Sequence, residues 1–260
     1  MSARPDPSQF RRRLLAGETL LGSFVKFPTG HSTEILGSVG FDFVVIDEEH
    51  GPFDRAATDQ ALMGARAGRI AGLVRVPEPG RILGALDDGA TGVLVPHVAS
   101  PEKARELAAL CRYRGGSRGF SNTTRAGDYG GRGMWAHVEA QDSEVALIGM
   151  IEDREALGQL DAIMATPGLD GVFIGRGDLT VALGAASLDS PETTAAAEAI
   201  LAAARRAGKP ACIMVATSAE AERWAKLGAS AFIVSSDQGF LRAAAAKTAG
   251  DFASLRSALQ

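Results

Sequence analysis

The stretch FDFVVIDEEHGPFD, residues 41–54, decides how the rest of the chain is interpreted. Its first half, Phe43 to Ile46 with Phe41 before it, is a short apolar run typical of a buried strand. The run then ends in three acidic residues and His50. Such an ending is either the solvated start of a loop or a set of groups with a chemical task, and the surrounding sequence decides between the two.

Similar apolar, β-branched runs recur along the chain at regular spacing. They are GSFVKF (22–27), FDFVVID (41–47), AGLVRV (71–76), GVLVP (92–96), ALIGMIE (146–152), GVFIG (171–175), ACIMVA (211–216) and AFIVSS (231–236). Because these runs are continuously apolar, they predict strands buried on both faces, as in a parallel sheet. Helical patterns separate them, so the sequence predicts a (β/α)8 TIM barrel that occupies residues 1–260 as one domain. A doubly wound open sheet is the alternative, and eight near-equal units favour closure.

The composition is that of a globular protein with a full core, since 46% of the residues are hydrophobic and 22% are charged. The net charge of −4 and the scattered basic residues argue against a nucleic-acid-binding surface. Two cysteines, Cys111 and Cys212, do not indicate a disulfide framework, and we find neither a signal peptide nor an apolar run of about 18 residues. We therefore expect a cytoplasmic protein that binds neither nucleic acid nor membrane.

In barrels of this kind the chemistry lies at the C-terminal ends of the strands. The residues that the predicted strands place there are Lys26; Asp47, Glu49 and His50; Arg75; Pro96 and His97; Glu152; Arg176 and Asp178; Thr217 and Ser218; and Ser235 and Asp237. The solvation of loops does not by itself account for so many polar groups at one rim.

Two of these carboxylates, Glu152 and Asp178, follow consecutive strands. Neighbouring strands lie about 4.8 Å apart, so side chains at their ends can share one ion. Two carboxylates completed by water and substrate oxygens suit a hard divalent cation such as Mg2+ or Mn2+. Taken alone, such a pair is more often two solvated acids, and the flanking sequence changes that balance.

The longest irregular segment is RGGSRGFSNTTRAGDYGGRGMWAHVEAQDSE, residues 114–144, which follows the fourth predicted strand. A loop of this length in a compact domain is usually a functional lid or disordered. The alanine-rich tail from Phe240 onward predicts one or two C-terminal helices.

Four stretches in order resemble the HpcH/HpaI family of metal-dependent pyruvate aldolases. They are FDFVVIDEEHGPFD, LVRVPEPGRILGALDDGATGVLVPHV, GMIEDREALGQLDAI and LDGVFIGRGDLTVALG, and the resemblance covers about residues 15–240. Each motif alone is weak, whereas I-D-x-E-H, V-R-x-P, I-E-x-x-E-A and G-x-F-I-G-x-x-D-L in this order are highly specific. The resemblance implies a barrel of the phosphoenolpyruvate/pyruvate superfamily. It also implies a class II aldolase that cleaves 4-hydroxy-2-oxo acids to pyruvate and an aldehyde through a metal-stabilised pyruvate enolate.

The resemblance further implies a role for each matching residue. Glu152 and Asp178 ligate a divalent ion (Mg2+, Mn2+ or Co2+) that pyruvate chelates, and Gly177 and Asp178 offer backbone N–H groups to the pyruvate carboxylate. Arg75 points at the keto oxygen, and His50, paired with Asp87, serves acid–base chemistry. Asp47 and Glu49 lie behind these groups and support them. The roles fit the reaction, because a cation and an arginine stabilise charge that develops on the keto oxygen. A histidine that titrates near neutrality can remove the 4-hydroxyl proton. There is a simpler alternative for each residue. His50 could be a loop histidine without a role, and Arg75 could form only a structural ion pair with Asp47.

Three places depart from the family pattern. Met150 stands where the best-known members have glutamine, Arg176–Gly177 replaces a Pro–Ala pair, and Glu48 replaces a small residue. The 114–144 segment has its own character, and we expect it to shape the aldehyde pocket. These differences predict a shift in substrate and not a loss of the chemistry.

The sequence leaves other functions open. A citrate-lyase-like acyl-CoA lyase or a 2-oxo-acid decarboxylase would use the same metal and carboxylates. Lys26 could form a Schiff base if its surroundings lowered its pKa. A binding protein without activity is a third alternative, against which the joint presence of Glu152, Asp178, Arg75 and His50 argues. Family members are commonly hexamers, dimers of trimers whose C-terminal helices are exchanged, so the resemblance implies a homo-oligomer of this kind.

Overall fold

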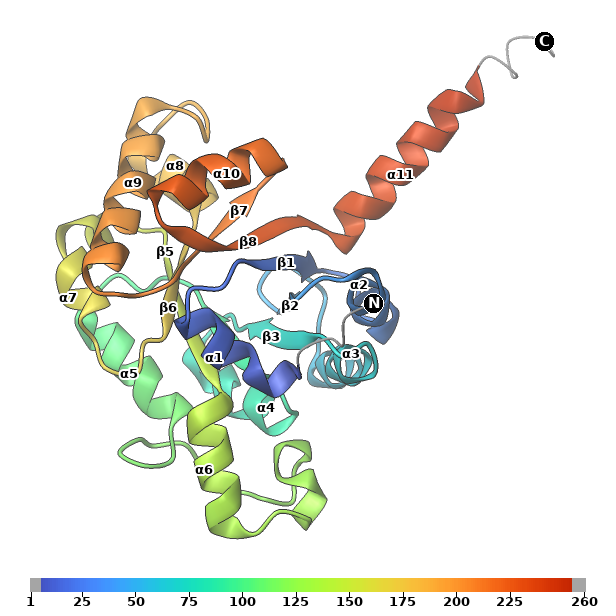
Figure 1. Cartoon of the computed structure of the whole chain (residues 1–260), viewed down its shortest axis with the longest axis vertical. Helices are drawn as coiled ribbons and strands as arrows, with labels where there is room; N and C mark the ends of the chain where they lie inside the picture. The colour runs from blue at the N-terminus through green and yellow to red at the C-terminus, as the bar shows by residue number, and fades with distance from the viewer. Residues whose placement is uncertain (1–5, 254–260) are drawn as a thin grey trace.

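The predicted barrel is confirmed in the computed structural model, which describes residues 6–253. Eight parallel strands close into one barrel in chain order, with β8 next to β1 (Figure 1). The strands are β1 Leu20–Val25, β2 Phe43–Asp47, β3 Ala71–Arg75, β4 Gly92–Val95, β5 Ala146–Ile151, β6 Gly171–Ile174, β7 Ala211–Val215 and β8 Ala229–Ser236. The alternative of an open sheet is therefore wrong. The ends of the predicted domain, residues 1–5 and 254–260, lie outside the described residues.

Most α-helices cover the outside of the barrel (Figure 1). They are α1 Phe10–Leu15, α2 Gly30–Val39, α3 Arg55–Ala67, α4 Ile82–Asp87, α5 Pro101–Cys111, α6 Met134–Glu144, α7 Leu160–Met164, α8 Arg176–Leu183, α9 Pro191–Arg206, α10 Ser218–Leu227 and α11 Asp237–Asp251. Short 3-10 helices, Pro7–Gln9, Pro79–Arg81, Arg125–Gly130 and Arg154–Gly158, precede α1, α4, α6 and α7. Thr29 and Asp54 cap α2 and α3, because their side chains accept backbone N–H groups that a helix start leaves unpaired.

The strands are buried on both faces because an apolar layer lies on each side of them. The inner layer fills the barrel with side chains such as Phe43, Leu73 and Phe173. The outer layer lies between strands and helices and contains Val74 of β3 and Leu107 of α5. Since a charge is costly in either layer, polar groups collect at the strand ends.

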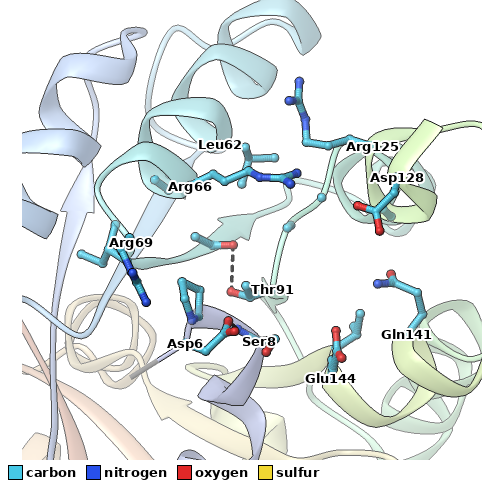
Figure 2. A pocket seen from close by; sticks show the side chains of 18 of the residues that line it. Asp6, Ser8, Leu62, Arg66, Arg69, Thr91, Arg125, Asp128, Gln141 and Glu144 are labelled. Atoms are coloured by element: carbon cyan, nitrogen blue, oxygen red, sulfur yellow. Dashed lines mark hydrogen bonds between the residues drawn. The ribbon is translucent and has the colours of Figure 1, made fainter. Parts of the chain in front are cut away.

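The 114–144 segment differs from its prediction. Its second half forms α6, so a long irregular loop was the wrong expectation there. The segment leads into β5 and lies at the N-terminal end of the barrel, where it lines a cavity of about 490 Å3 together with residues such as Thr91 and Val145 before β4 and β5. Figure 2 shows this cavity with Arg66 on one side and Glu144 on the other. Within its own chain the segment does not line the cavity at the C-terminal strand ends.

Helix α11 extends away from the barrel (Figure 1). Its contacts within the chain are mainly with β1 and β8. The prediction of a C-terminal helix is confirmed as far as Asp251, where α11 ends, and the last residues of the tail lie outside the described residues. Leu241 and Phe252 expose apolar surface in this part of the chain. Over residues 6–253, we find no helix with the length and apolar character needed to cross a bilayer.

Candidate active site

A cavity of about 800 Å3 opens at the C-terminal ends of the strands. Its floor includes Met150 and Phe173 from the barrel interior. Its walls are lined by five of the residues predicted at this rim, Lys26, Arg75, Arg176, Asp178 and Ser235, and by Gly177. Strand ends far apart in the sequence meet here because β8 closes against β1.

Glu152 follows the last residue of β5 and is only 2% exposed. Its Oε1 accepts the backbone N–H of His97 at 2.9 Å, whereas its buried Oε2 has no hydrogen-bond partner among the described residues. Burial raises the pKa of Glu152 to about 7, and the nearby charge of Asp178 acts in the same direction. The site thus holds a carboxylate with one buried oxygen that no hydrogen-bond donor of the described residues reaches.

Glu152 and Asp178 fit a divalent metal ion, because a cation would satisfy the buried oxygen that no protein donor reaches. Gly175 leaves the space open, since a Cβ at this position would lie 2.5 Å from Glu152 Oε2. Over residues 6–253, no group of three or more His, Cys, Asp or Glu side chains is arranged to hold a metal. Water and substrate oxygens would therefore complete the coordination of a hard cation.

Gly177 and Asp178 lie in the first turn of α8. The first backbone N–H groups of a helix have no partner within it, and together with the helix dipole they favour an anion. Both residues line the cavity. Their backbone can therefore receive a carboxylate next to the two metal-binding candidates.

His97 has a structural task that the sequence did not reveal. Its backbone has a φ of +56° and aims its N–H at Glu152, while its Nδ1 lies 3.0 Å from Asp153 Oδ1. Burial lowers the pKa of His97, but Asp153 and Glu152 outweigh this effect and the net shift is upward. The position at a strand end was the available signal, whereas the partner was not predictable from it.

Arg75 and Asp47 form a buried ion pair at the ends of β3 and β2. Arg75 Nε lies 2.8 Å from Asp47 Oδ1 and its Nη2 lies 2.6 Å from Oδ2, while its Nη1 lies 3.2 Å from Glu49 Oε2. Burial alone raises the pKa of Asp47, but Arg75, the backbone N–H of His50 and Lys26 outweigh it and lower the pKa. The predicted support of Arg75 by the two acids agrees with this geometry.

His50 and Asp87 are not paired within one chain. The His50 side chain is 57% exposed, and its Nε2 lies 3.8 Å from Glu49. Asp87 ends α4 on the outside of the barrel, where its buried Oδ1 lies 3.5 Å from Nη2 of the buried Arg118 and accepts no hydrogen bond from the described residues. The expected pairing of His50 with Asp87 is therefore not formed within a single copy, because the two residues lie on different faces of the fold.

The departures from the family pattern have different structural settings. Met150 is 2% exposed and forms part of the cavity floor. Arg176 is held in the wall by Glu220. Glu48 turns to the outside, where it accepts hydrogen bonds from Thr58 and from Arg81 of the segment before α4. Only the first two can therefore affect what the cavity binds.

Comparisons with known proteins agree with this geometry. A sequence profile described as HpcH/HpaI aldolase/citrate lyase matches residues 21–244. The 5-keto-4-deoxy-D-glucarate aldolase of Enterobacter sp. (strain 638) is 35% identical over 250 residues, which are 95% of this chain and 97% of that protein. A HpcH/HpaI aldolase/citrate lyase family protein from Burkholderia cenocepacia J2315 has a similar crystal structure, with a TM-score of 0.88, 28% identity and coverage of 94% and 98%. The citrate synthase SbnG gives a TM-score of 0.85 at 26% identity, with coverage of 96% and 99%.

These likenesses confirm the predicted family and the prediction of a carbon–carbon lyase. They span nearly the whole chain, so the barrel and the rim that carries Glu152 and Asp178 lie within the matched region. The chain belongs to the HpcH/HpaI aldolase/citrate lyase family.

Proposed function

We propose that the protein is a class II aldolase that cleaves 4-hydroxy-2-oxo acids into pyruvate and an aldehyde, or joins these products in the reverse direction. The observation that carries the proposal is the buried Glu152, whose unpartnered oxygen lies in a site shared with Asp178. The relatives named 5-keto-4-deoxy-D-glucarate aldolase support a substrate with a keto group and a hydroxyl group in this relationship.

The residues at the C-terminal ends of the strands divide the work of binding. Glu152 and Asp178 would hold the divalent ion, which when bound supplies Lewis-acid stabilisation of the charge that grows on the keto oxygen. The backbone N–H groups of Gly177 and Asp178 receive the substrate carboxylate. Arg75, held in place by Asp47, adds a fixed positive charge that needs no reorganisation during the reaction.

His50 is the proposed general base. Its backbone N–H is anchored on Asp47 at 3.1 Å, so the exposed imidazole lies at the mouth of the barrel. In the cleavage direction it accepts the proton of the 4-hydroxyl while the bond between C3 and C4 breaks. The electron pair of that bond remains with the pyruvate half, which takes up a proton at C3 before it leaves.

We further propose that the protein is a homo-oligomer in which a neighbouring copy supplies Asp87 to His50. Two observations support this arrangement: Asp87 lines a cavity of about 270 Å3 on the outside of the barrel and not the one at the strand ends, and α11 extends away from the barrel with Leu241 exposed. The proposed oligomer is the hexamer that the family resemblance implies, a dimer of trimers. Light scattering of the full chain tests it, and a monomer at micromolar concentration would refute it.

The first experiment follows pyruvate release from 4-hydroxy-2-oxo acids of different chain length. We expect EDTA to abolish release and Mg2+, Mn2+ or Co2+ to restore it. Glu152→Gln and Asp178→Asn should each reduce the restored rate by about a hundredfold or more, whereas Glu106→Gln on the exposed face of α5 is the matched control and keeps the wild-type rate. Release that survives EDTA, together with borohydride trapping of pyruvate on Lys26, would instead establish a Schiff-base enzyme.

A second candidate is an acyl-CoA-dependent lyase or synthase, and the likeness to the citrate synthase SbnG favours it. Met150 at the floor of the cavity agrees with a substrate that differs from the one used by the best-known aldolases. Release of free thiol from acetyl-CoA in the presence of oxaloacetate, without pyruvate release from any hydroxy-oxo acid, would select this candidate. The decarboxylase alternative would be detected as carbon dioxide release from a 2-oxo acid.

A further inference from the structure

We propose that Arg118 is a positioning residue for Asp87. It holds one oxygen of the Asp87 carboxylate, keeps this group charged and leaves its outer side to meet His50 of a neighbouring copy. The inference rests on the proposed function, in which a neighbouring copy supplies Asp87. It adds a residue that none of the four family-like stretches contains. The burial of Arg118, its anchors and the two-sided surroundings of Asp87 carry it.

The Arg118 guanidinium is buried and fixed by two anchors other than Asp87. Its side chain has 0% exposure. Its Nη1 donates to Oε1 of Gln141 at 3.1 Å, and its Cζ lies 4.5 Å from the centre of the Tyr113 ring. A cation over an aromatic face is attracted by the charge distribution of the ring. The guanidinium thus has a defined place that does not depend on the carboxylate it meets.

Helix α6 supports both anchors of Arg118. It carries Gln141 itself, and it holds Tyr113 at two points, because the backbone N–H of Tyr113 donates to Asp142 Oδ1 at 2.8 Å and the Tyr113 hydroxyl lies 3.1 Å from His137 Nε2. The 114–144 segment therefore has a structural task at this end of the barrel. It builds a rigid support that places one arginine against the end of α4.

Asp87 has different surroundings on its two sides. Its Oδ1 is buried and lies 3.5 Å from Arg118 Nη2, and among residues 6–253 no other carboxylate pairs with Arg118. The Asp87 side chain as a whole is 13% exposed and lines the cavity of about 270 Å3 on the outside of the barrel. Arg118 therefore covers one oxygen, and a group that enters this cavity from outside meets the uncovered part of the carboxylate.

The charge of Arg118 matters because the partner of a general base must be ionised. A carboxylate stabilises the imidazolium that forms when histidine takes up a proton, whereas a neutral carboxyl group does not. Burial raises the pKa of Asp87 and Asp88 acts in the same direction, while Arg118 and Arg55 lower it, and the net shift is upward. Without Arg118 the carboxyl group would keep its proton to a still higher pH.

The neighbouring acid shows that this arrangement is specific to Asp87. Asp88 pairs with Arg55, whose Nε lies 3.1 Å from Asp88 Oδ2 and whose side chain is 64% exposed. An ion pair between exposed groups is held loosely by solvent-screened attraction. Of two consecutive carboxylates, the fold thus anchors one on a buried cation and leaves the other in a surface pair.

The first test follows pyruvate release from a 4-hydroxy-2-oxo acid by the metal-loaded enzyme. We expect Arg118→Met to lower kcat by about tenfold or more, the effect of losing a contact between charged groups. The same change made in Asp87→Asn should cause no further loss, because the two residues act as a unit. Arg11→Met, which removes an ion pair with Asp170, is the control and keeps the wild-type kcat. A wild-type kcat in Arg118→Met, or a further loss of similar size in Asp87→Asn, would overturn the proposal.

The second test asks in which copy Arg118 acts. Arg118→Met is unfolded and refolded together with His50→Ala, and separately with Asp87→Ala. The first mixture should regain activity, because the His50→Ala chains offer an intact Arg118 and Asp87 to the intact His50 of the Arg118→Met chains. The second mixture should stay inactive, because every chain in it lacks one member of the pair. A residue that only stabilises its own barrel does not produce this pattern.

An active second mixture would overturn the proposal, because it would assign Arg118 and Asp87 to different sites. An inactive first mixture would do the same if a reference mixture of Asp87→Ala and His50→Ala is active. An inactive reference mixture would refute the pairing of His50 with Asp87 across copies, and with it the outward role that Arg118 is assigned.

A third measurement does not depend on turnover. Urea unfolding at one protein concentration compares the wild type, Arg118→Met, Asp87→Asn and the double variant. We expect the unfolding equilibrium constant of the double variant to differ by about tenfold from the product of the two single effects, as for residues in contact. Independent effects would overturn the proposal. Coupling without pyruvate release from any hydroxy-oxo acid would keep Arg118 as the residue that holds Asp87 and refute the aldolase.

Discussion

The backbone N–H of His97 donates to Glu152 Oε1 at 2.9 Å, and His97 has a φ of +56° in this arrangement. The bond fixes one carboxylate oxygen and leaves Oε2 buried without a protein donor. A non-glycine residue in the left-handed region costs about 1–3 kcal/mol. The fold therefore supports a locally strained backbone in order to orient one acidic side chain, which is expected at a site that binds a ligand.

Metal binding should depend on pH through Glu152. Because burial raises its pKa to about 7, the metal-free protein carries a proton there below pH 7, and a metal ion must displace it. We expect Mn2+ affinity to fall about tenfold per pH unit well below pH 7 and to level off above it. Calorimetry in two buffers with different ionisation enthalpies would measure the released proton.

The raised pKa of Glu152 should also make the stability of the metal-free protein depend on pH. Between about pH 4.5 and pH 7 the folded, metal-free protein binds more protons at Glu152 than the unfolded chain, so its free energy of unfolding should decrease as pH rises. Glu152→Gln should remove this dependence. An affinity for Mn2+ that stays constant from pH 5.5 to 7.5, with no proton release, would contradict the assignment.

Asp47→Asn should destabilise the protein strongly, because the buried guanidinium of Arg75 loses the carboxylate that accepts two of its hydrogen bonds and is left with Glu49 as its counter-charge. Breaking one side of a buried ion pair costs about 3–5 kcal/mol. Since the pKa of Asp47 is lowered in the folded state, its stabilising contribution is present above about pH 4 and is lost as pH falls through the folded pKa. Urea unfolding at several pH values measures both effects. Glu106→Gln, which breaks an exposed pair with Lys103, is the control and should change the free energy of unfolding by less than about 0.5 kcal/mol.

Met150→Gln should lower stability in the absence of ligand. Met150 is buried among apolar side chains such as Phe173, and an amide without a partner there costs about 1–3 kcal/mol. If the amide can contact a bound 2-oxo acid, part of this loss should be recovered when metal and the non-reactive pyruvate analogue oxalate are added. Thermal unfolding with and without these ligands provides the measurement. An equal loss under both conditions would show that position 150 does not reach the ligand.

Mixing two inactive variants tests whether His50 and Asp87 meet across copies. His50→Ala and Asp87→Ala are each expected to reduce activity at least about a hundredfold, as expected for loss of a general base or its partner. After joint unfolding and refolding, some sites in the mixed oligomers would combine His50 from one variant with Asp87 from the other. Activity should then recover to a substantial fraction of the wild-type value. Absence of recovery, in oligomers shown to be mixed by mass spectrometry, would place the pair elsewhere.

The part of the site that was predictable comes from consecutive strands. Glu152 and Asp178 follow β5 and β6, and in a barrel of consecutive parallel strands, neighbours in sequence are also neighbours in space. The apolar strand pattern therefore predicts both the fold and the meeting of these two carboxylates. The same reasoning places Asp47 beside Arg75, since β2 and β3 are adjacent and these residues are paired in register.

The 114–144 segment shows why the rest was not predictable. Its glycine and arginine content indicates irregular structure, yet α6 forms within it, and its position before β5 puts it at the N-terminal end of the barrel. Composition describes local flexibility but does not say which end of the barrel a connection occupies. The position of Asp87 outside the barrel was missed for a related reason, because α4 is too short to reveal its orientation from periodicity.

The sequence by itself determined the eight-stranded barrel, the family and the group of residues at its C-terminal rim, because each follows from local patterns read along the chain. The tertiary structure alone decided which of these residues touch. Asp237 reaches Lys26 and His97 reaches Glu152 across 211 and 55 positions of the chain. Such contacts arise from barrel closure and from backbone conformations at strand ends, and a hydrogen bond depends on distances of a few tenths of an ångström that no residue pattern encodes.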